Sequence, residues 1–272
     1  METSTLTTAP EVRRPRTVQS VSHAVTLLRA IAQRRTPLTL SDLARKAQLS
    51  KPATYNLLGT LVSLQLIRRD DDGCYLPDWG LYELGCRMVD AEALRDAARA
   101  PLHRLLQQVP GALLLSIMTG DKVLYVDRAE TSPGFRMVAD IGRRSPLHTT
   151  ASGKVFLAAM PEKRISGYLS RPLVSVTPAT ITSRRALRAE IALTREHGYG
   201  VSWGEQERLL SSVAVPLRGQ RGTVRAALAV VVPTRDLERI APSRLVLRLA
   251  HAATEICTEW DRTTLAPEFS GR

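Results

Sequence analysis

The amino-acid sequence predicts an α+β protein with an N-terminal winged helix-turn-helix, a helical connector and a C-terminal α/β domain. Within residues 38–75, two short helical segments joined by a tight turn precede a small hairpin. Two more helical patterns follow at 79–89 and 94–109, and β-branched runs then share the chain with long helices up to residue 260. Strands in one sheet with long helices on its face give an α+β domain, here of about 160 residues.

Residues 1–17 are rich in Thr, Pro and Arg and show no apolar periodicity, which predicts a flexible basic arm. Arg14 and Arg16 could lie along DNA phosphates or reach a minor groove, as basic arms do. A solvated tail is the alternative for either residue.

The predicted winged helix-turn-helix covers residues 18–79. Its first helix, 18–32, has Val21, Val25, Leu28 and Ile31 on one face. We expect Ser41 and Ser50 to cap the N-termini of the next two helices with their side-chain oxygens. Pro52 follows in the first turn of the third helix, where a missing N–H costs nothing.

The third helix is the predicted recognition helix. The spacing places Ala53, Leu57, Leu61 and Leu64 toward the core. The opposite face is polar and partly small, as an approach to base edges and phosphates requires. Residues 66–67 then pair with 74–76 across an Asp-Asp-Gly turn as the wing. The candidates for DNA contact are Ser41, Ser50, Lys51, Thr54, Tyr55 and Asn56, with Arg68 in the wing and Arg14 and Arg16 in the arm.

Charge supports a phosphate-binding surface at this end of the chain. Residues 1–69 hold 11 Lys/Arg and 3 Asp/Glu, whereas residues 70–272 hold 27 and 23, so two-thirds of the formal charge of +12 lies in the first quarter. Asp70, Asp71 and Asp72 at the wing tip would repel phosphate. Either the tip points away from DNA, or Arg68 and Arg69 make the wing contacts. A three-helix packing module that touches no nucleic acid is the alternative.

Composition limits the remaining possibilities. The longest apolar run, 226–232, is too short to span a bilayer, and the N-terminus has no hydrophobic signal region, so we expect no membrane association. Three scattered cysteines without C-x-x-C spacing fit a cytoplasmic protein with reduced thiols. Five scattered histidines show no metal-ligand spacing, so no metal or other cofactor is expected. Binding to DNA would place the protein at the nucleoid.

The connector is expected over 80–110 and the second domain over 111–265. Its strands are predicted at 112–118, 123–126, 212–217 and 224–232. Its helices are predicted at 152–160, at 184–197 with Ser183 as cap, and at 243–260, where Leu245, Leu249, Ala253, Ile256 and Trp260 form one stripe.

The segment 142–154 ends in small and hydroxyl-bearing residues where a helix starts. Free backbone N–H groups near Ala151 and Ser152 would form an anion site there, with the hydroxyls of Thr149 and Thr150 nearby. An ordinary capped helix is the alternative. No nucleophile elbow, phosphate-binding loop or catalytic triad spacing occurs, so we expect no enzyme.

These motifs in this order resemble the IclR family of transcriptional regulators over roughly residues 18–262. The resemblance rests on Leu-Thr-Leu before the helix-turn-helix, Leu-Ser-Lys-Pro-Ala-Thr within it, Gly-Arg-Arg-Ser-Pro-Leu-His at 142–148 and Ala-Ser-Gly-Lys at 151–154. Thr-Ile-Thr at 180–182, Glu-His-Gly-Tyr at 196–199, Glu205 and the strand 213–217 complete it.

The resemblance implies a C-terminal effector-binding domain with a GAF-like α/β fold, and homodimers or homotetramers on double-stranded operator DNA. It implies control by a small-molecule effector, expected to be a carboxylate, and of the two signs of regulation it favours repression. Effector-site positions carried over from the family are Met137, His148, Ala151, Ser152, Ser202 and Ser212.

Three positions depart from the family pattern. Ser202 stands where an acid is common and Ser212 where a cysteine can occur, which makes the pocket less acidic. Asn56 stands where the family usually has Arg, so a contact is lost or moved to Lys51, Tyr55 or the arm. A metabolite-binding protein or enzyme with a vestigial helix-turn-helix remains the alternative function.

Overall fold

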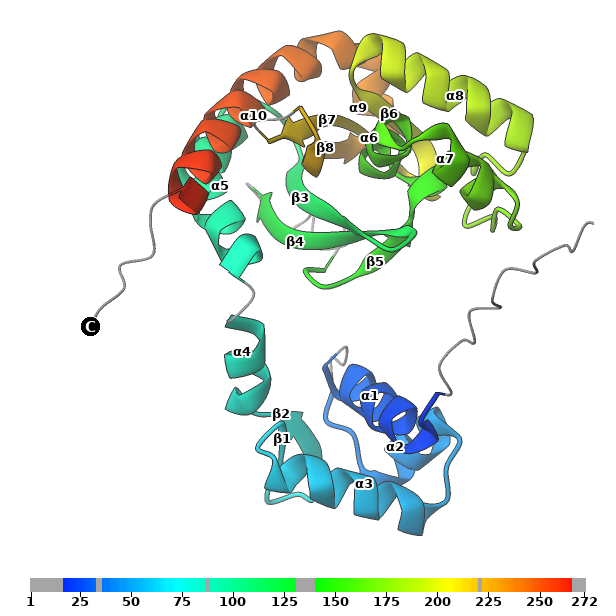
Figure 1. The fold of residues 1–272 in the computed structure, drawn as a ribbon, viewed down its shortest axis with the longest axis vertical. Helices are drawn as coiled ribbons and strands as arrows, with labels where there is room; N and C mark the ends of the chain where they lie inside the picture. Colours follow the sequence, from blue (N-terminus) through cyan, green and yellow to red (C-terminus); the bar gives the residue numbers. More distant parts are fainter. Residues whose placement is uncertain (1–16, 33–35, 87–88, 131–139, 220–221, 266–272) are drawn as a thin grey trace, which may run out of the picture. The chain divides into compact units, whose positions relative to one another are not determined.

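The computed structural model describes residues 17–32, 36–86, 89–130, 140–219 and 222–265 (Figure 1). The chain divides into two compact units with a boundary between residues 88 and 89. Helix α4 (Trp79–Cys86) belongs to the first unit and α5 (Val89–Leu106) to the second, so the two predicted connector helices fall in different units. The predicted α+β class, a winged helix-turn-helix followed by an α/β domain, is confirmed.

Besides α4, the described part of the first unit contains three helices and a two-stranded wing. Its core is formed by apolar side chains from every element, with Leu27, Leu43, Leu58 and Ile67 fully buried. The elements are α1 (Gln19–Ala32), α2 (Leu40–Ala47), α3 (Lys51–Ser63), β1 (Ile67–Arg69) and β2 (Tyr75–Pro77), the two strands pairing antiparallel.

The buried faces of two of these helices differ from the prediction. In α3 the buried residues are Thr54, Leu58 and Leu61, and Leu64 is 61% exposed. In α1 the buried residues are Leu27 and Ile31, whereas Val21 is 60% exposed. Each helix offers two adjacent apolar stripes, and packing against the neighbouring elements decides between them where spacing alone cannot.

The cap of α2 is also different. Thr39 is the N-cap residue, and its side chain and that of Asp42 each accept from the other's backbone N–H in a capping box. Ser41 lies exposed in the first turn of the helix and does not cap it. At α3 the prediction is confirmed, because Ser50 Oγ accepts from the Ala53 N–H at 3.4 Å.

The second unit is built on one six-stranded antiparallel sheet. The predicted strands are confirmed, and two more are present: β5 is only three residues long, and β6 contains two glycines, so neither has a clear strand pattern. In sheet order the strands are β5 (Arg144–Pro146), β4 (Lys122–Glu130), β3 (Ala112–Thr119), β8 (Val224–Pro233), β7 (Leu210–Arg218) and β6 (Gly200–Glu207).

Helices cover both faces of this sheet. Figure 1 shows α5 and α10 side by side on one face and α6, α7 and α8 on the other. The three predicted helices are confirmed, and α7, α9 and a 3₁₀ turn were not predicted. The elements are the 3₁₀ turn (Leu147–Thr149), α6 (Ala151–Ala159), α7 (Glu162–Leu169), α8 (Arg184–His197), α9 (Thr234–Ile240) and α10 (Pro242–Leu265).

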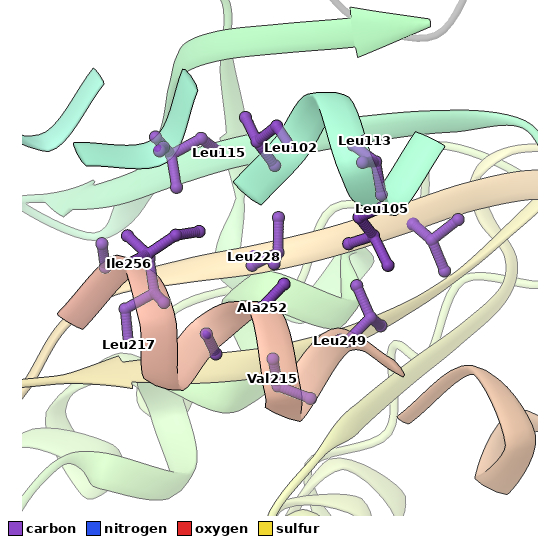
Figure 2. Close-up of a cluster of buried hydrophobic side chains, with 14 of the residues drawn as sticks. Leu102, Leu105, Leu113, Leu115, Val215, Leu217, Leu228, Leu249, Ala252 and Ile256 are labelled. Carbon is purple, nitrogen blue, oxygen red and sulfur yellow. The ribbon is translucent and has the colours of Figure 1, made fainter. Parts of the chain in front are cut away.

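The larger hydrophobic core lies between the sheet and the α5–α10 pair. Figure 2 shows Leu102 and Leu105 of α5 and Leu249 and Ile256 of α10 converging on Leu228 of the sheet. The predicted stripe of α10, from Leu245 to Trp260, is buried here.

The opposite face of the sheet is lined by small side chains. Strand β8 directs Leu228 and Val230 toward α10, and alternation places Ala227 and Ala229 toward α6. Gly153 allows α6 to pack closely against the 3₁₀ turn, because a Cβ on Gly153 would lie 2.0 Å from the Leu147 carbonyl oxygen. The start of α6 is thereby fixed above the small-residue part of the sheet.

Candidate functional sites

The exposed face of α3 carries three of the predicted DNA contacts. Lys51, Tyr55 and Asn56 are all exposed, and Tyr55 presents 57% of its surface. Gly59 lies on the same open face, since a Cβ there would meet no atom within 4 Å. The first turn has no acidic residue, so the positive end of the helix dipole and Lys51 act together.

Thr54 does not lie on this face. Its side chain is fully buried, and its Oγ1 donates to the Ser50 carbonyl oxygen at 2.9 Å. The predicted DNA contact by Thr54 is therefore wrong, because the residue packs in the core of its own domain. Ser41 lies on α2, and Arg14 and Arg16 fall outside the described residues.

The charged residues of the wing have two roles: Arg69 and Asp70 make contacts within the wing, and Arg68 is exposed. Arg69 donates through Nε to the Gly73 carbonyl oxygen at 3.2 Å and lies 5.9 Å from the Tyr75 ring centroid. Asp70 accepts from the Cys74 N–H at 2.7 Å, so this acid closes the wing turn. Arg68 is exposed on β1 and has no ion pair within the described part of the chain. Of the two wing arginines, Arg68 is the one available to DNA.

A second candidate site is a cavity of about 40 Å³ between the sheet and the first turn of α6. Its floor comes from β3, β7 and β8, and β6 closes one side. Hydroxyl groups dominate its polar surface. It is lined by Leu114, Tyr125, Thr150, Ala151, Ser152, Ser202, Gln206, Glu207, Leu210, Ser211, Ser212, Ala229 and Val231.

The first turn of α6 presents unused hydrogen-bond donors to this cavity. Thr150 caps the helix, and its Oγ1 accepts from the Gly153 N–H at 3.0 Å. The backbone N–H groups of Ala151 and Ser152 have no acceptor among the described residues, although both residues are at least 98% buried. The side chain of Ser152 lines the same cavity. Buried donors of this kind need a partner in the cavity.

Side chains from β6 complete the wall. Ser202 pairs with Ser212 across the two strands, and its Oγ donates to the Thr149 carbonyl oxygen at 3.0 Å. Thr149 Oγ1 lies within hydrogen-bond distance of Gln206. Glu207 forms an ion pair of 3.4 Å with Arg143, so the one carboxylate among the described lining residues is partly neutralised.

The family-derived positions are not all brought together. Ala151, Ser152, Ser202 and Ser212 line this cavity, whereas His148 does not. His148 is buried beside it: Nδ1 lies 2.7 Å from the Tyr168 hydroxyl and Nε2 lies 3.0 Å from the Val174 carbonyl oxygen. Burial holds the pKa of His148 below its usual 6.5, which keeps the ring neutral. Met137 falls outside the described residues.

Several residues of the lining and one buried ion pair were not predicted from the sequence. The side chains of Tyr125 on β4 and Gln206 on β6 line the cavity. Burial raises the pKa of the Tyr125 hydroxyl. Lys154 is buried beneath the cavity against Glu205. A lone lysine between Gly153 and the apolar residues 155–159 was the available signal, because a charge inside a buried helix needs a partner.

An exposed recognition helix with a wing, followed by an α/β domain with a cavity lined in part by hydroxyl groups, defines a DNA-binding transcriptional regulator. Residues 20–71 match the IclR helix-turn-helix domain, and residues 86–258 match the family described as bacterial transcriptional regulator IclR C-terminal. The chain belongs to the IclR family of transcriptional regulators, as its motifs predicted. No helix in the described ranges is long and apolar enough to cross a membrane.

Individual relatives match this chain over most of their own length. The HTH-type transcriptional regulator XynR of Escherichia coli is 32% identical, over 81% of this chain and 88% of its own. The acetate operon repressor of Salmonella typhimurium is 25% identical over 94% of both chains. An IclR homolog from Microbacterium hydrocarbonoxydans, solved in complex with 4-hydroxybenzoate, is 29% identical with a TM-score of 0.81, over 89% of this chain and 99% of that one.

Proposed function

We propose that this regulator is a repressor whose affinity for operator DNA is set by a small carboxylate bound at the first turn of α6. The observation that carries the proposal is the pair of unused backbone donors there, the N–H groups of the buried residues Ala151 and Ser152, beside the cavity. A helix N-terminus favours an anion through these groups and through its dipole. A cavity of about 40 Å³ favours a compact acid.

Two relatives support the choice of ligand and of sign. One is bound to 4-hydroxybenzoate, a carboxylate, and another is named a repressor of the acetate operon. The lining gives the enzyme alternative no specific support, because none of its described residues is a histidine or lysine and the Glu207 carboxylate is engaged by Arg143.

The effector site is tested by calorimetric titration of acetate, pyruvate, benzoate and 4-hydroxybenzoate into the full-length protein and its Ser152→Phe variant. The phenyl ring fills the cavity, so we expect the acid that binds the parent to lose binding while operator affinity is kept. In the parent that acid should change operator affinity about 5- to 150-fold, the usual range for allosteric coupling. Ser166→Phe, on the exposed face of α7, is the matched control. Unchanged acid binding by Ser152→Phe would place the effector elsewhere.

The DNA site is tested on the exposed face of α3. Lys51→Gln should weaken binding to all duplexes and reduce the slope of log K against log salt by about 0.9, the contribution of one phosphate. Asn56→Ala should instead relax preference at particular bases, since an amide pairs with an adenine edge. Parent-like binding by both variants, measured by fluorescence anisotropy over a salt series, would show that α3 does not read DNA.

We further propose that the chain acts as a homodimer or homotetramer at the nucleoid. One recognition helix covers only a few base pairs, so specific binding needs two half-sites. Val18, which directly precedes α1, and Val21 and Val25 on α1 are 61%, 60% and 38% exposed, which leaves an apolar stripe for a second copy. Val21→Glu should reduce the mass measured by light scattering at micromolar concentration, and a monomeric parent would refute the assembly.

A further inference from the structure

Lys154 is a fully buried lysine on the pocket helix α6. Its side chain is 1% exposed, and Nζ lies 2.7 Å from Glu205 Oε1, 3.0 Å from Glu190 Oε1 and 2.7 Å from the Val201 carbonyl oxygen. One ammonium thus joins three elements: α6, α8 and the strand β6. A buried ion pair of this kind adds little net stability over a well-packed apolar pair, so its presence indicates a role other than stability.

Glu205 is the unusual partner in this cluster. It is 3% exposed, and its Oε1 accepts from Lys154 and from the Trp203 N–H at 3.3 Å. Its other oxygen, Oε2, is buried and has no hydrogen-bond partner among the described residues. An unsatisfied buried carboxylate oxygen is costly, and in a native structure it calls for an explanation.

The backbone around Glu205 supplies that explanation. The pairing of β6 with β7 is irregular between Trp203 and Glu207, and Gly204 has a φ of +63°. Such a bulge re-aims the side chains that flank it. Ser202 precedes the bulge and Gln206 and Glu207 end it, and all three line the cavity.

Other hydrogen bonds also hold the bulge in place, and one of them runs from the Gly204 N–H to Ser211 Oγ at 3.2 Å. Thr177 Oγ1 donates to the Gly204 carbonyl oxygen at 2.7 Å, and Thr180 Oγ1 donates to that of Glu205 at 2.8 Å. Both come from the segment before α8, whereas Lys154 is the link from below to α6, the opposite wall of the cavity. Together with the hydrogen bonds of Ser202 and Gln206 to Thr149, the Lys154–Glu205 pair therefore sets the separation between the donors of α6 and the side chains of β6.

We infer that Lys154 and Glu205 are positioning residues that set effector affinity by holding the β6 bulge against the first turn of α6. The inference rests on the proposed effector site. Neither side chain lines the cavity, so both act through Ser202, Gln206 and Glu207.

Glu190 provides a matched control. Its carboxylate pairs with the same Lys154 ammonium, and 27% of its side chain is exposed. Its helix, α8, contributes no residue to the lining of the cavity. Glu205→Met and Glu190→Met each leave Lys154 with one carboxylate and replace an acid by an unbranched apolar side chain. Only Glu205→Met removes the tie to the bulge.

The first measurement is hydrogen exchange by mass spectrometry on the full-length protein without ligand. Glu205→Met should speed exchange of the Gly204 amide, which donates to Ser211 Oγ and not to Glu205, at least about tenfold, and Glu190→Met should leave it within about twofold of the parent. Equal exchange of this amide in the two variants would overturn the inference. Because this readout needs no effector, it decides whether the pair holds the bulge even if no carboxylate binds the parent.

The second measurement separates positioning from stability. The double variant Lys154→Met with Glu205→Met replaces the ion pair by apolar side chains, which should preserve the melting temperature. With the acid that binds the parent in the titration series, we expect its affinity to fall at least about tenfold, as for a truncated positioning contact. Parent-like affinity in the double variant refutes the positioning role. Failure of every acid to bind the parent instead refutes the proposed effector site.

Discussion

Replacing Gly153 by alanine should destabilise the second domain and disturb the start of α6. The added Cβ would lie 2.0 Å from the Leu147 carbonyl oxygen, 2.5 Å from its Cα and 2.6 Å from its carbonyl carbon. All three atoms belong to the backbone, so no side-chain rotation relieves the clash. Either α6 or the 3₁₀ turn must shift by more than about 1 Å to restore ordinary contact distances near 3.5 Å.

Overpacking of a close contact costs roughly 1–3 kcal/mol of unfolding free energy. For a domain of this size, 1 kcal/mol corresponds to about 2–4 °C in Tm, so Gly153→Ala should melt roughly 2–12 °C below the parent. The shift displaces the N–H groups of Ala151 and Ser152, so binding of the carboxylate should weaken as well.

Gly167→Ala is the control for this substitution. Gly167 lies inside α7, and a Cβ there would meet no atom within 4 Å. Alanine should therefore stabilise that helix by about 0.5–1 kcal/mol through its higher helix propensity. Thermal unfolding followed by circular dichroism should move the two variants in opposite directions. A Gly153→Ala protein that melts at or above the parent would show that α6 does not pack as closely as the structure indicates.

Three further predictions follow from burial. Burial lowers the pKa of His148 below 6.5, so as the pH falls the unfolded chain takes up a proton before the folded chain does. The stability that is present above about pH 6.5 is therefore lost in acid. Tm measured against pH should fall less steeply for His148→Gln. Leu249→Ala should cost about 2–5 kcal/mol in denaturant unfolding, and Leu247→Ala, on the exposed face of the same helix, less than about 0.5. Thr54→Val should bind DNA as the parent does, and weaker binding in the anisotropy assay would contradict its burial.

The sequence predicted those elements whose signals are local. Ser50 and Ser183 cap helices, and the β-branched runs of β7 and β8 form strands as their spacing indicates. The face that α3 buries was predicted one residue out of phase, because Leu57 and Leu58 are adjacent and both apolar. Choosing between them requires the packing of α1 and α2, which periodicity does not contain.

The candidate pocket shows the same limit more sharply. The hydroxyl-rich stretch 149–152 predicted a helix N-terminus with free donors, and the structure places those donors in a cavity. The opposite wall comes from residues 202–207, about fifty positions further along the chain, and its shape depends on a bulge at a glycine with positive φ. No local pattern in this sequence predicts the β-bulge. What the sequence does contain is an unexplained charge, Lys154, within a buried helix, and an acid, Glu205, within a strand. Each residue is costly to bury alone, so their pairing follows from the fold as a whole, and it joins the two walls of the proposed effector site.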